Sequence, residues 1–254
     1  MKQSIRIAWL YPDLMSTYGD RGNVIVLQKR CLWRGIDAEV VPVTLETDVK
    51  KLKLCDIVFM GGAQDRQQKL AGSDFLNRKG PVVKEMVEDN VPSLFVCAAY
   101  QFVGNYYRPY QGEDILGAGI FDLYTEHLGD HAKRLIGNVV AEIIDPHELR
   151  GEKIVGFENH GGYTHLGTVM KPFAKIVIGG GNNGADGYEG ATYKNAIGSY
   201  FHGPLLPKNP HIADWLIKKA LEKKYGSSDV LKPLDDSMAT HAQLAIIERL
   251  GAAV

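Results

Sequence analysis

The segment Ser93-Leu94-Phe95-Val96-Cys97-Ala98-Ala99, with Gln101 shortly after it, decides how this chain of 254 residues folds. Three apolar residues precede the cysteine, as in a short buried strand, and two small residues follow it. We therefore expect a strand over 94–96 that ends in a sharp turn at Cys97. At the carboxyl end of a parallel strand, such a turn points the sulfur into the crevice where ligands bind.

Working outward from this segment, apolar runs of strand length alternate with stretches of helical spacing. Strands are predicted over 5–10, 38–43 and 57–60, and helices over 24–33 and around 82–87. This alternation predicts a mostly parallel α/β sheet with right-handed crossovers. The second half is richer in short apolar runs, at 139–144, 154–157, 176–178 and 197–201. A helix capped by Asn209 is predicted to end before Gly226, followed by a linker over 227–236 and a last helix over 239–250.

Composition narrows the class of protein. Apolar residues make up 45% of the chain and charged residues 23%, and the formal net charge is −1. There is no basic run that would favour nucleic acid and no run of about 20 apolar residues, so we expect no membrane span, and we interpret the short apolar run near the N-terminus as a strand and not as a signal peptide. Three scattered cysteines do not predict a disulfide framework or a metal site. We expect a cytoplasmic protein with reduced thiols.

Cys97 and His202 are the candidate catalytic pair. His202 follows the apolar run 197–201 and precedes Gly203-Pro204, so it also lies at the end of a strand. An imidazole there can take the thiol proton and later protonate a leaving group. The alternative is that Cys97 is a buried core thiol, which is what we expect of Cys31 and Cys55.

A tetrahedral intermediate at Cys97 needs backbone donors for its oxyanion. The amide of Ala98 is one candidate, because it directly follows the nucleophile. The Gly61-Gly62 turn, which follows the strand 57–60, is predicted to supply the other. An ordinary tight turn is the alternative for these glycines.

Three features occur in an order that resembles the class I glutamine amidotransferases. They are a strand followed by Gly61-Gly62, a strand followed by Cys97 with Gln101 four residues later, and a strand followed by His202. The resemblance covers roughly residues 5–205. It implies a flavodoxin-like α/β fold with a mostly parallel central sheet flanked by helices. It also implies a glutaminase core over 1–205, with a C-terminal helical extension over 206–254 packed on the same domain. In that family a cysteine attacks the side-chain amide of glutamine, ammonia leaves and water hydrolyses the thioester; Gln101 stands at a position that contacts glutamine.

Four further segments resemble the GatD-like branch of this family, which is related to cobyric acid synthase amidotransferase domains. They are Leu10-Tyr11-Pro12-Asp13, Tyr18-Gly19-Asp20-Arg21-Gly22-Asn23, Arg134-Leu135-Ile136-Gly137-Asn138 and Gly156-Phe157-Glu158-Asn159-His160-Gly161-Gly162. The resemblance gives Arg134 a substrate-binding role, which suits a guanidinium facing the α-carboxylate of glutamine. Asn159 and Gly161 resemble residues that contact glutamine, and His160 between them is interpreted as structural.

The same resemblance implies a partner chain. GatD-like glutaminases deliver ammonia to MurT, a Mur-ligase-like subunit that amidates the D-glutamate of lipid II to D-isoglutamine in peptidoglycan synthesis. We expect no cofactor in this chain, since it has no nucleotide-binding loop, and ATP and Mg²⁺ on the partner. Alternatives are another acceptor, such as a cobyrinic acid derivative, an inert scaffold, or a DJ-1/PfpI-like cysteine protein with Asp13 as its strand-end acid.

The sequence departs from the class pattern at two places. Alanines replace the usual glycines after the cysteine, and Pro204 stands where many members carry the glutamate of a Cys-His-Glu triad. Either a dyad suffices or the acid comes from elsewhere; our hypothesis from the sequence is that the partner supplies it. The segment 18–23 receives no function from the sequence.

Overall fold

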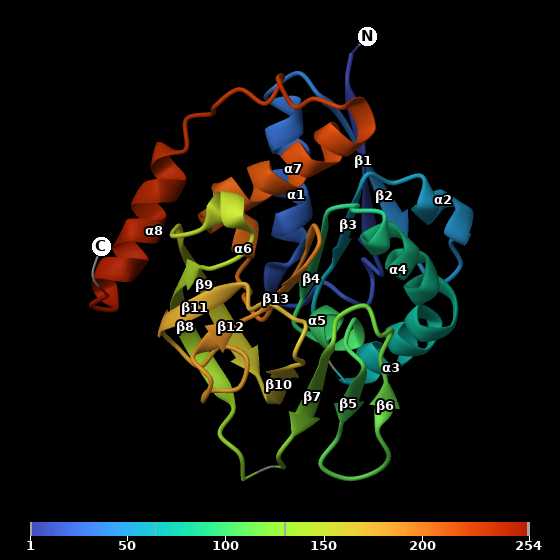
Figure 1. Ribbon diagram of the computed structural model, residues 1–254, viewed down its shortest axis with the longest axis vertical. Coiled ribbons are helices and arrows are strands. Elements are labelled where there is room, and N and C mark those ends of the chain that lie inside the picture. Colours follow the sequence, from blue (N-terminus) through green and yellow to red (C-terminus); the bar gives the residue numbers. More distant parts are fainter. Residues whose placement is uncertain (1, 64, 130, 253–254) are drawn as a thin grey trace.

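The computed structural model describes residues 2–63, 65–129 and 131–252, and a six-stranded sheet lies at its centre (Figure 1). The strand order is β13-β14-β4-β3-β1-β2. These strands are β1 (Ser4–Leu10), β2 (Asp37–Val43), β3 (Ile57–Met60), β4 (Ser93–Val96), β13 (Ala191–Tyr193) and β14 (Ala196–Ser199). All neighbours pair in parallel except β13, which is antiparallel to β14 at the edge. The order β2-β1-β3-β4-β14 is the flavodoxin-like order, so the predicted fold class is confirmed.

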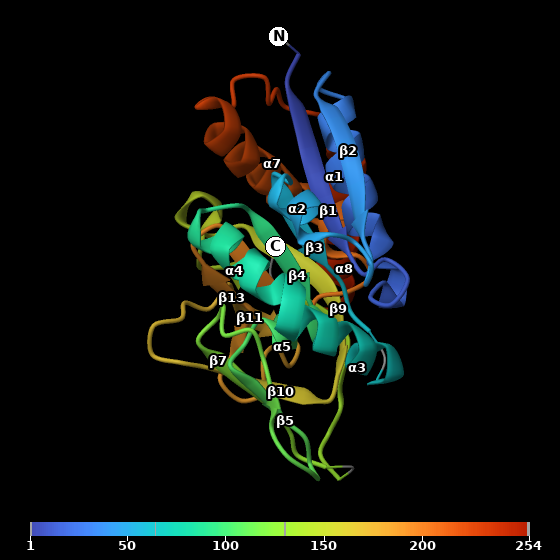
Figure 2. The same ribbon diagram turned by 90° about the vertical axis from the view of Figure 1, so that its right-hand side faces the viewer.

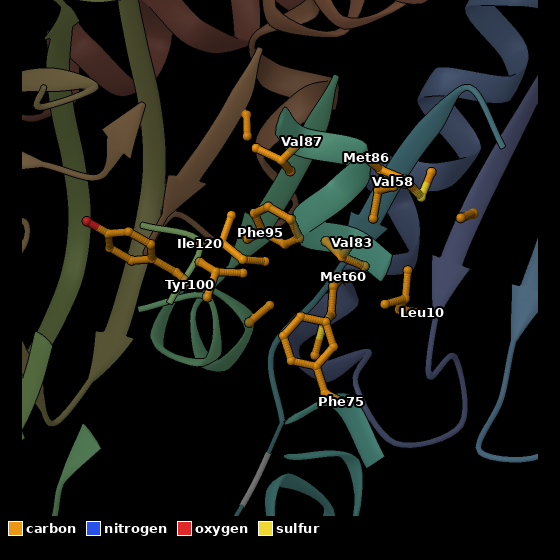
Figure 3. Close-up of a cluster of buried hydrophobic side chains, with 14 of the residues drawn as sticks. Leu10, Val58, Met60, Phe75, Val83, Met86, Val87, Phe95, Tyr100 and Ile120 are labelled. Carbon is orange, nitrogen blue, oxygen red and sulfur yellow. The ribbon is translucent and has the colours of Figure 1, made fainter. Parts of the chain in front are cut away.

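Helices cover both faces of this sheet, as the perpendicular view in Figure 2 shows. On one face, α1 (Arg21–Leu32) and α7 (Pro210–Tyr225) pack against inward side chains such as Ile7, Phe59 and Val96. On the other face, α4 (Gly80–Glu88) and α5 (Ala98–Phe102) pack against Leu10, Met60 and Phe95 (Figure 3). Because β3 and β4 are buried on both faces, every residue in them is apolar or small. Both strands could therefore be predicted from continuous runs of such residues in the sequence.

Shorter helices connect these elements. They are α2 (Val49–Lys53), α3 (Asp65–Asp74), the π-helix η2 (Phe75–Lys79), α6 (Leu205–Lys208) and the 3₁₀ turns η1 (Thr17–Gly19) and η3 (His147–Leu149). The π-helix joins α3 to α4, and its buried Lys79 pairs with Asp74, which also accepts a hydrogen bond from Tyr11 Oη at 2.8 Å. This ionic contact fixes the α3–α4 junction against the end of β1.

Two four-stranded sheets built from the middle and second half of the chain lie beside the central sheet (Figure 1). One has the order β10-β7-β5-β6, from β5 (Tyr106–Arg108), β6 (Ile115–Leu116), β7 (Leu123–His127) and β10 (Gly162–Leu166). The other has the order β12-β11-β8-β9, from β8 (Leu135–Ile143), β9 (Lys153–His160), β11 (Ala174–Ile178) and β12 (Tyr188–Glu189). The sequence predicted β8, β9 and β11 but not the first of these sheets.

The helix α7 begins and ends where the sequence predicts, but Asn209 does not cap it with its side chain. Instead its amide bridges β9, accepting from Val155 N at 2.9 Å and donating to Val155 O at 2.8 Å. Satisfying the buried backbone of a strand replaces the capping role predicted for Asn209. At the other end, Gly226 has φ 74°, the left-handed conformation of a helix C-cap.

The last helix, α8 (Ser237–Arg249), packs through Ile247 on Val140 and Val155. The linker before it is held by Arg30, whose guanidinium pairs with Asp214 at 2.6 Å and with Asp236 at 2.5 Å. Residues of α7 and α1 belong to the same apolar cluster, so the C-terminal extension over 206–254 packs directly on the core. The boundary at residue 205 stays a prediction. None of the helices in the described part of the chain combines the length and apolarity needed to cross a membrane.

Candidate functional site

Cys97 occupies the turn between β4 and α5, at the edge where the parallel strands end. Its backbone has φ 56° and ψ −110°, a conformation that is strained for a residue with a side chain. The turn is held because Cys97 N donates to Ser199 O at 2.8 Å, which ties it to the end of β14. Cys97 therefore has the geometry of a nucleophile elbow.

The other two cysteines are in different surroundings. Cys31 and Cys55 are buried in the apolar clusters, and burial raises the pKa of their thiols to about 12 and about 11. Cys97 is partly exposed. Among the described thiols, Cys97 is the one that a ligand can reach, which agrees with the prediction that the other two are structural.

His202 lies next to Cys97 and is fully buried. A two-residue β-bridge with Phe157 fixes its backbone, and its Nδ1 lies 3.1 Å from Oδ1 of Asp20. Burial lowers the pKa of His202, but the thiol of Cys97 and the carboxylate of Asp20 outweigh it and raise the pKa to about 10. The site therefore favours the protonated form of the His202 ring.

The Gly61-Gly62 turn lies directly behind this pair. A Cβ on Gly62 would lie 2.8 Å from Cε1 of His202, and one on Gly61 would lie 2.9 Å from Oδ2 of Asp20. The Gly62 N–H donates to Asp20 Oδ2 at 2.7 Å. The predicted role of this amide as an oxyanion donor is therefore not met in this conformation, because Asp20 holds it. The amide of Ala98 remains a candidate donor, because Ala98 directly follows Cys97 at the start of α5 and lines the cleft.

A cleft of about 1220 Å³ opens over Cys97 and His202. Its walls also carry six of the other residues that the sequence analysis singled out: Ala98, Gln101, Arg134, Asn159, His160 and Gly161. The sequence-predicted residues thus converge on one cavity, apart from the two glycines that back it.

The exposed Arg134 is oriented by Asn159. Its Nε donates to Asn159 Oδ1 at 2.7 Å, and its Nη2 donates to the backbone carbonyl of Asn159 at 3.1 Å. A Cβ on Gly161 would lie 3.5 Å from Nη1 of the same guanidinium. Asn159 and Gly161 therefore shape the position of a cation at the cleft wall, where it can receive a carboxylate.

Gln101 is held at the base of the cleft. Its Nε2 donates to Tyr200 Oη at 3.2 Å, and its Oε1 accepts from Gln68 at 3.3 Å. Tyr200 in turn contacts Thr164, which pairs with Thr125 across β7 and β10. This chain of hydrogen bonds fixes an amide close to the nucleophile.

His160 fits a structural role. Its ring stacks on Tyr200 with 3.6 Å between centroids, and its Nδ1 lies 2.7 Å from the carbonyl of Gly162. Burial lowers its pKa to about 4, so the ring is neutral at physiological pH. It forms part of the cleft wall and does not replace His202 beside the sulfur.

Sequence reasoning missed Asp20, Gln68 and Tyr200. For Asp20 there was a signal, because it lies in the segment 18–23 that resembles GatD-like proteins, but nothing in the sequence indicated its neighbour. Asp13 is exposed, so it is not placed to act as a strand-end acid beside the thiol. Within the described residues, no group of histidine, cysteine and acidic side chains could hold a metal ion.

Comparisons with known proteins agree with this geometry. Residues 6–210 match the CobB/CobQ-like glutamine amidotransferase domain. The lipid II isoglutaminyl synthase (glutamine-hydrolyzing) subunit GatD of Staphylococcus aureus is 41% identical over 93% of this chain and 92% of its own length. The corresponding subunit of Streptococcus pneumoniae is 37% identical over 92% of this chain and 87% of its own length.

More distant relatives share the fold. A probable cobyric acid synthase of Methanothermobacter thermautotrophicus is 29% identical over 61% of this chain and 31% of its own length. A crystal structure of a glutamine amidotransferase superposes with a TM-score of 0.58 at 13% identity, over 84% of this chain and 98% of that chain. The glutaminase domain of a Trypanosoma brucei CTPS with bound acivicin has a TM-score of 0.52 at 13% identity, over 88% and 95% of the two chains.

Proposed function

Because this chain belongs to the CobB/CobQ-like glutamine amidotransferase family, we propose that Cys97 and His202 hydrolyse L-glutamine through a covalent thioester. The observation that carries the proposal is the strained turn that presents a reachable Cys97 beside His202 at the base of a cleft. Membership of the family makes the chain a glutaminase subunit. The roles of its residues and the steps of the reaction are part of our proposal.

In the first half-reaction, the Cys97 thiolate attacks the carbonyl carbon of the glutamine side-chain amide. The Sγ–C bond forms as the carbonyl oxygen becomes an oxyanion, which the Ala98 N–H stabilises. His202, as an imidazolium, then gives its proton to the departing nitrogen, and the C–N bond breaks. Ammonia leaves and a γ-glutamyl thioester remains on Cys97.

In the second half-reaction, water attacks the thioester. The neutral His202 takes a proton from this water, and the resulting tetrahedral intermediate expels the Cys97 thiolate with glutamate as product. The thiolate and the imidazolium face each other again at the end of the cycle. The raised pKa of His202, about 10, favours the imidazolium that donates the proton in the first half-reaction.

Glutamine recognition is assigned to the cleft wall. Arg134, aligned by Asn159, takes the α-carboxylate of free glutamine. Gln101 contacts the substrate close to the reacting amide, and Gly161 leaves room for the backbone of the amino acid to approach. A cleft that is lined by both a guanidinium and the nucleophile suits a substrate with one carboxylate and one distal amide.

We propose lipid II as the eventual acceptor, through a MurT-like partner that holds ATP and Mg²⁺. This rests on the two GatD relatives, which align along nearly their whole length with this chain. Cobyric acid synthases give weaker support for a choice of acceptor, since the chain covers only 31% of the relative from Methanothermobacter. The exposed position of Asp13 gives a DJ-1/PfpI-like function no support.

The test is ammonia release from L-glutamine by the purified chain, with and without a co-purified Mur-ligase-like subunit. Cys97→Ala should abolish release, whereas Cys31→Ala, a change at a buried thiol, should retain it. Release that persists in Cys97→Ala would contradict the assignment. For the acceptor, the complex with ATP, Mg²⁺ and lipid II should form D-isoglutamine, and a complex that releases ammonia without amidating lipid II would exclude that acceptor.

A further inference from the structure

Gln101 lies beside the nucleophile because the two residues are one helical turn apart. The backbone N–H of Gln101 donates to the carbonyl of Cys97 at 3.1 Å, which is the hydrogen bond of an α-helical turn. Residues at this spacing lie on the same face of a helix, and both of these line the cleft. Only 7% of Gln101 is exposed, so its side-chain amide depends on partners within the protein.

The two ends of this amide are similar in shape but opposite in hydrogen-bonding character. Nε2 of Gln101 donates to Tyr200 Oη at 3.2 Å, and Oε1 accepts from Gln68 Nε2 at 3.3 Å. Turning the Gln101 amide over would place two NH₂ groups against each other, with no acceptor between them. The neighbours therefore favour one orientation, in which one N–H and one lone pair of Gln101 stay available to a ligand in the cleft.

The direction of the Tyr200 hydroxyl follows from its other contact. Tyr200 is fully buried, and its Oη lies 2.6 Å from Thr164 Oγ1, which lies 2.7 Å from Thr125 Oγ1. Because Oη accepts from Gln101 and a buried hydroxyl proton needs an acceptor, the Tyr200 proton is directed at Thr164. Burial raises the pKa of Tyr200, so the hydroxyl keeps this proton at physiological pH.

Packing fixes both partners of this hydrogen bond. His160 stacks on the Tyr200 ring with 3.6 Å between centroids, and Tyr100 meets the same ring edge-on at 5.3 Å. Gly162 leaves the space that the Gln101 amide occupies, since a Cβ on Gly162 would lie 2.5 Å from Nε2. The position of the hydroxyl and the approach of the amide are thus both set by close contacts.

We propose that Tyr200 is a positioning residue that determines specificity: with Gln68, it fixes the Gln101 amide so that the cleft distinguishes the carboxamide of glutamine from the carboxylate of glutamate. The inference rests on the proposed function and deepens it. A carboxamide offers both a donor and an acceptor, which complement the N–H and the lone pair that Gln101 keeps available. A carboxylate offers acceptors only and meets the Oε1 lone pair with no proton between them, so the product is held less firmly than the substrate.

The experiment compares Tyr200→Phe with Tyr100→Phe in the complex with the Mur-ligase-like subunit. Both changes remove one hydroxyl group from the same buried cluster, but Tyr100 Oη bonds to Asn182 and not to Gln101. Tyr200→Phe should raise KM for L-glutamine by about three- to tenfold with kcat within about twofold, because the hydrogen bond acts in substrate binding. The inhibition constant of L-glutamate should stay within about twofold, so that discrimination between substrate and product falls. Tyr100→Phe should leave KM and the inhibition constant at their wild-type values.

Two further variants test whether Tyr200 acts through Gln101. Gln101→Met removes the amide but keeps an unbranched side chain, and Tyr200→Phe should add little to KM in this background. Additive effects of the two changes would contradict the proposal. Thr164→Val removes the acceptor of the Tyr200 proton and serves as a second variant if the Tyr200→Phe protein fails to fold. It should also raise KM for L-glutamine and leave the inhibition constant of L-glutamate unchanged.

Binding measured without turnover separates this proposal from the proposed reaction. Isothermal titration calorimetry gives the Kd of L-glutamine for the Cys97→Ala complex, and adding Tyr200→Phe should weaken binding by about three- to tenfold. A wild type that hydrolyses glutamine, with a Tyr200→Phe variant of equal KM and equal inhibition by glutamate, would overturn the role of Tyr200 and leave the glutaminase standing.

The converse outcome is also distinguishable. A wild type that releases no ammonia, while Tyr200→Phe weakens glutamine binding to the Cys97→Ala complex, would support the role of Tyr200 and reject the proposed reaction. A Cys97→Ala complex that binds no L-glutamine, together with a wild type that releases no ammonia, would overturn both.

Discussion

Gly22 and Pro204 are in contact so close that a Cβ added to Gly22 would overlap the proline ring. Gly22 lies in the first turn of α1, and Pro204 follows His202 by two residues. This contact sets the distance between the segment that carries Asp20 and the segment that carries the base. The glycine is required here by the neighbouring ring and not by its backbone angles.

We therefore expect Gly22→Ala to destabilise the protein. Helix propensity alone would favour alanine by about 0.5–1 kcal/mol, whereas forcing a methyl group into a packed contact costs about 1–3 kcal/mol. The second effect should win, and urea unfolding measures it. Adding Pro204→Gly removes the ring, so the double variant should be more stable than the sum of the two single changes predicts. A Gly22→Ala protein as stable as the wild type would show that this contact does not limit the packing.

Arg134→Lys tests the guanidinium at the cleft wall. Lysine keeps the charge but loses the planar fork and its two hydrogen bonds to Asn159. KM for glutamine should rise by about tenfold, or roughly 1.4 kcal/mol, with little change in kcat, because binding of the α-carboxylate is the same in ground and transition states. Steady-state kinetics with the partner present measures both constants.

Asn159→Ala gives a matched control for this assignment. If Asn159 acts by orienting Arg134, its replacement should raise KM in the wild type but add little in the Arg134→Lys background. Additive effects of the two changes would instead mean that Asn159 contacts glutamine independently of Arg134.

The elements that could be predicted are those whose structure is determined by the residues within the element itself. Strands β3 and β4 are buried on both faces, so each is a continuous apolar or small run. Strand β5 reads Tyr-Tyr-Arg and β10 reads Gly-Tyr-Thr-His-Leu. In those strands, half-exposed polar and aromatic residues replace the apolar run, and pairing with β7 decides the structure.

The site shows the same division. Cys97 and His202 could be predicted because each closely follows a strand, β4 and β14, and strand ends in a parallel sheet converge. Asp20 could not, because it reaches His202 across 182 positions from a turn with no regular pattern. Asn209 was assigned to a helix cap from its neighbours in sequence, whereas the buried backbone of β9, which only the tertiary structure brings there, takes its side chain.

The buried carboxyl group of Glu189 should make the stability of the folded protein depend on pH. It is fully buried on β12, and its Oε1 accepts from Ser199 Oγ and Tyr200 N, both at 2.7 Å. Burial raises its pKa to about 8. Below the unfolded pKa of about 4.3, both states bind the proton. As the pH rises toward 8 only the unfolded state releases it, so this group makes the folded state less stable over that window and adds no further change above it.

Glu189→Gln should remove this dependence while keeping an oxygen acceptor for both hydrogen bonds. The free energy of unfolding of the variant, relative to the wild type, should therefore increase between pH 5 and pH 8, by an amount on the order of 1–3 kcal/mol. Urea unfolding at pH 5, 6.5 and 8 measures it. A difference between the two proteins that stays constant with pH would mean that the carboxyl group does not titrate differently in the folded state.

Two shortened chains test the boundary predicted at residue 205. A chain that ends at 205 loses α7, which buries Ile212, Ala213, Trp215, Leu216, Ile217, Ala220 and Leu221 against the central sheet. Burial of each large apolar side chain contributes about 1.5–3 kcal/mol, and a domain of this kind is stable by only about 5–15 kcal/mol in total. The chain ending at 205 should therefore fail to fold, although the family resemblance ends close to that position.

A chain that ends at 226 should behave differently. It keeps α7 and loses the contacts of Ile247 with Val140 and Val155 and the ion pair between Arg30 and Asp236. Because Arg30 retains its second partner, Asp214, the charge stays paired. We expect a folded protein with a lower Tm and an unchanged rate of Cys97 alkylation, measured by circular dichroism and mass spectrometry. If the chain ending at 205 folds and reacts like the longer one, then 1–205 is an independent unit and α7 is an accessory to it.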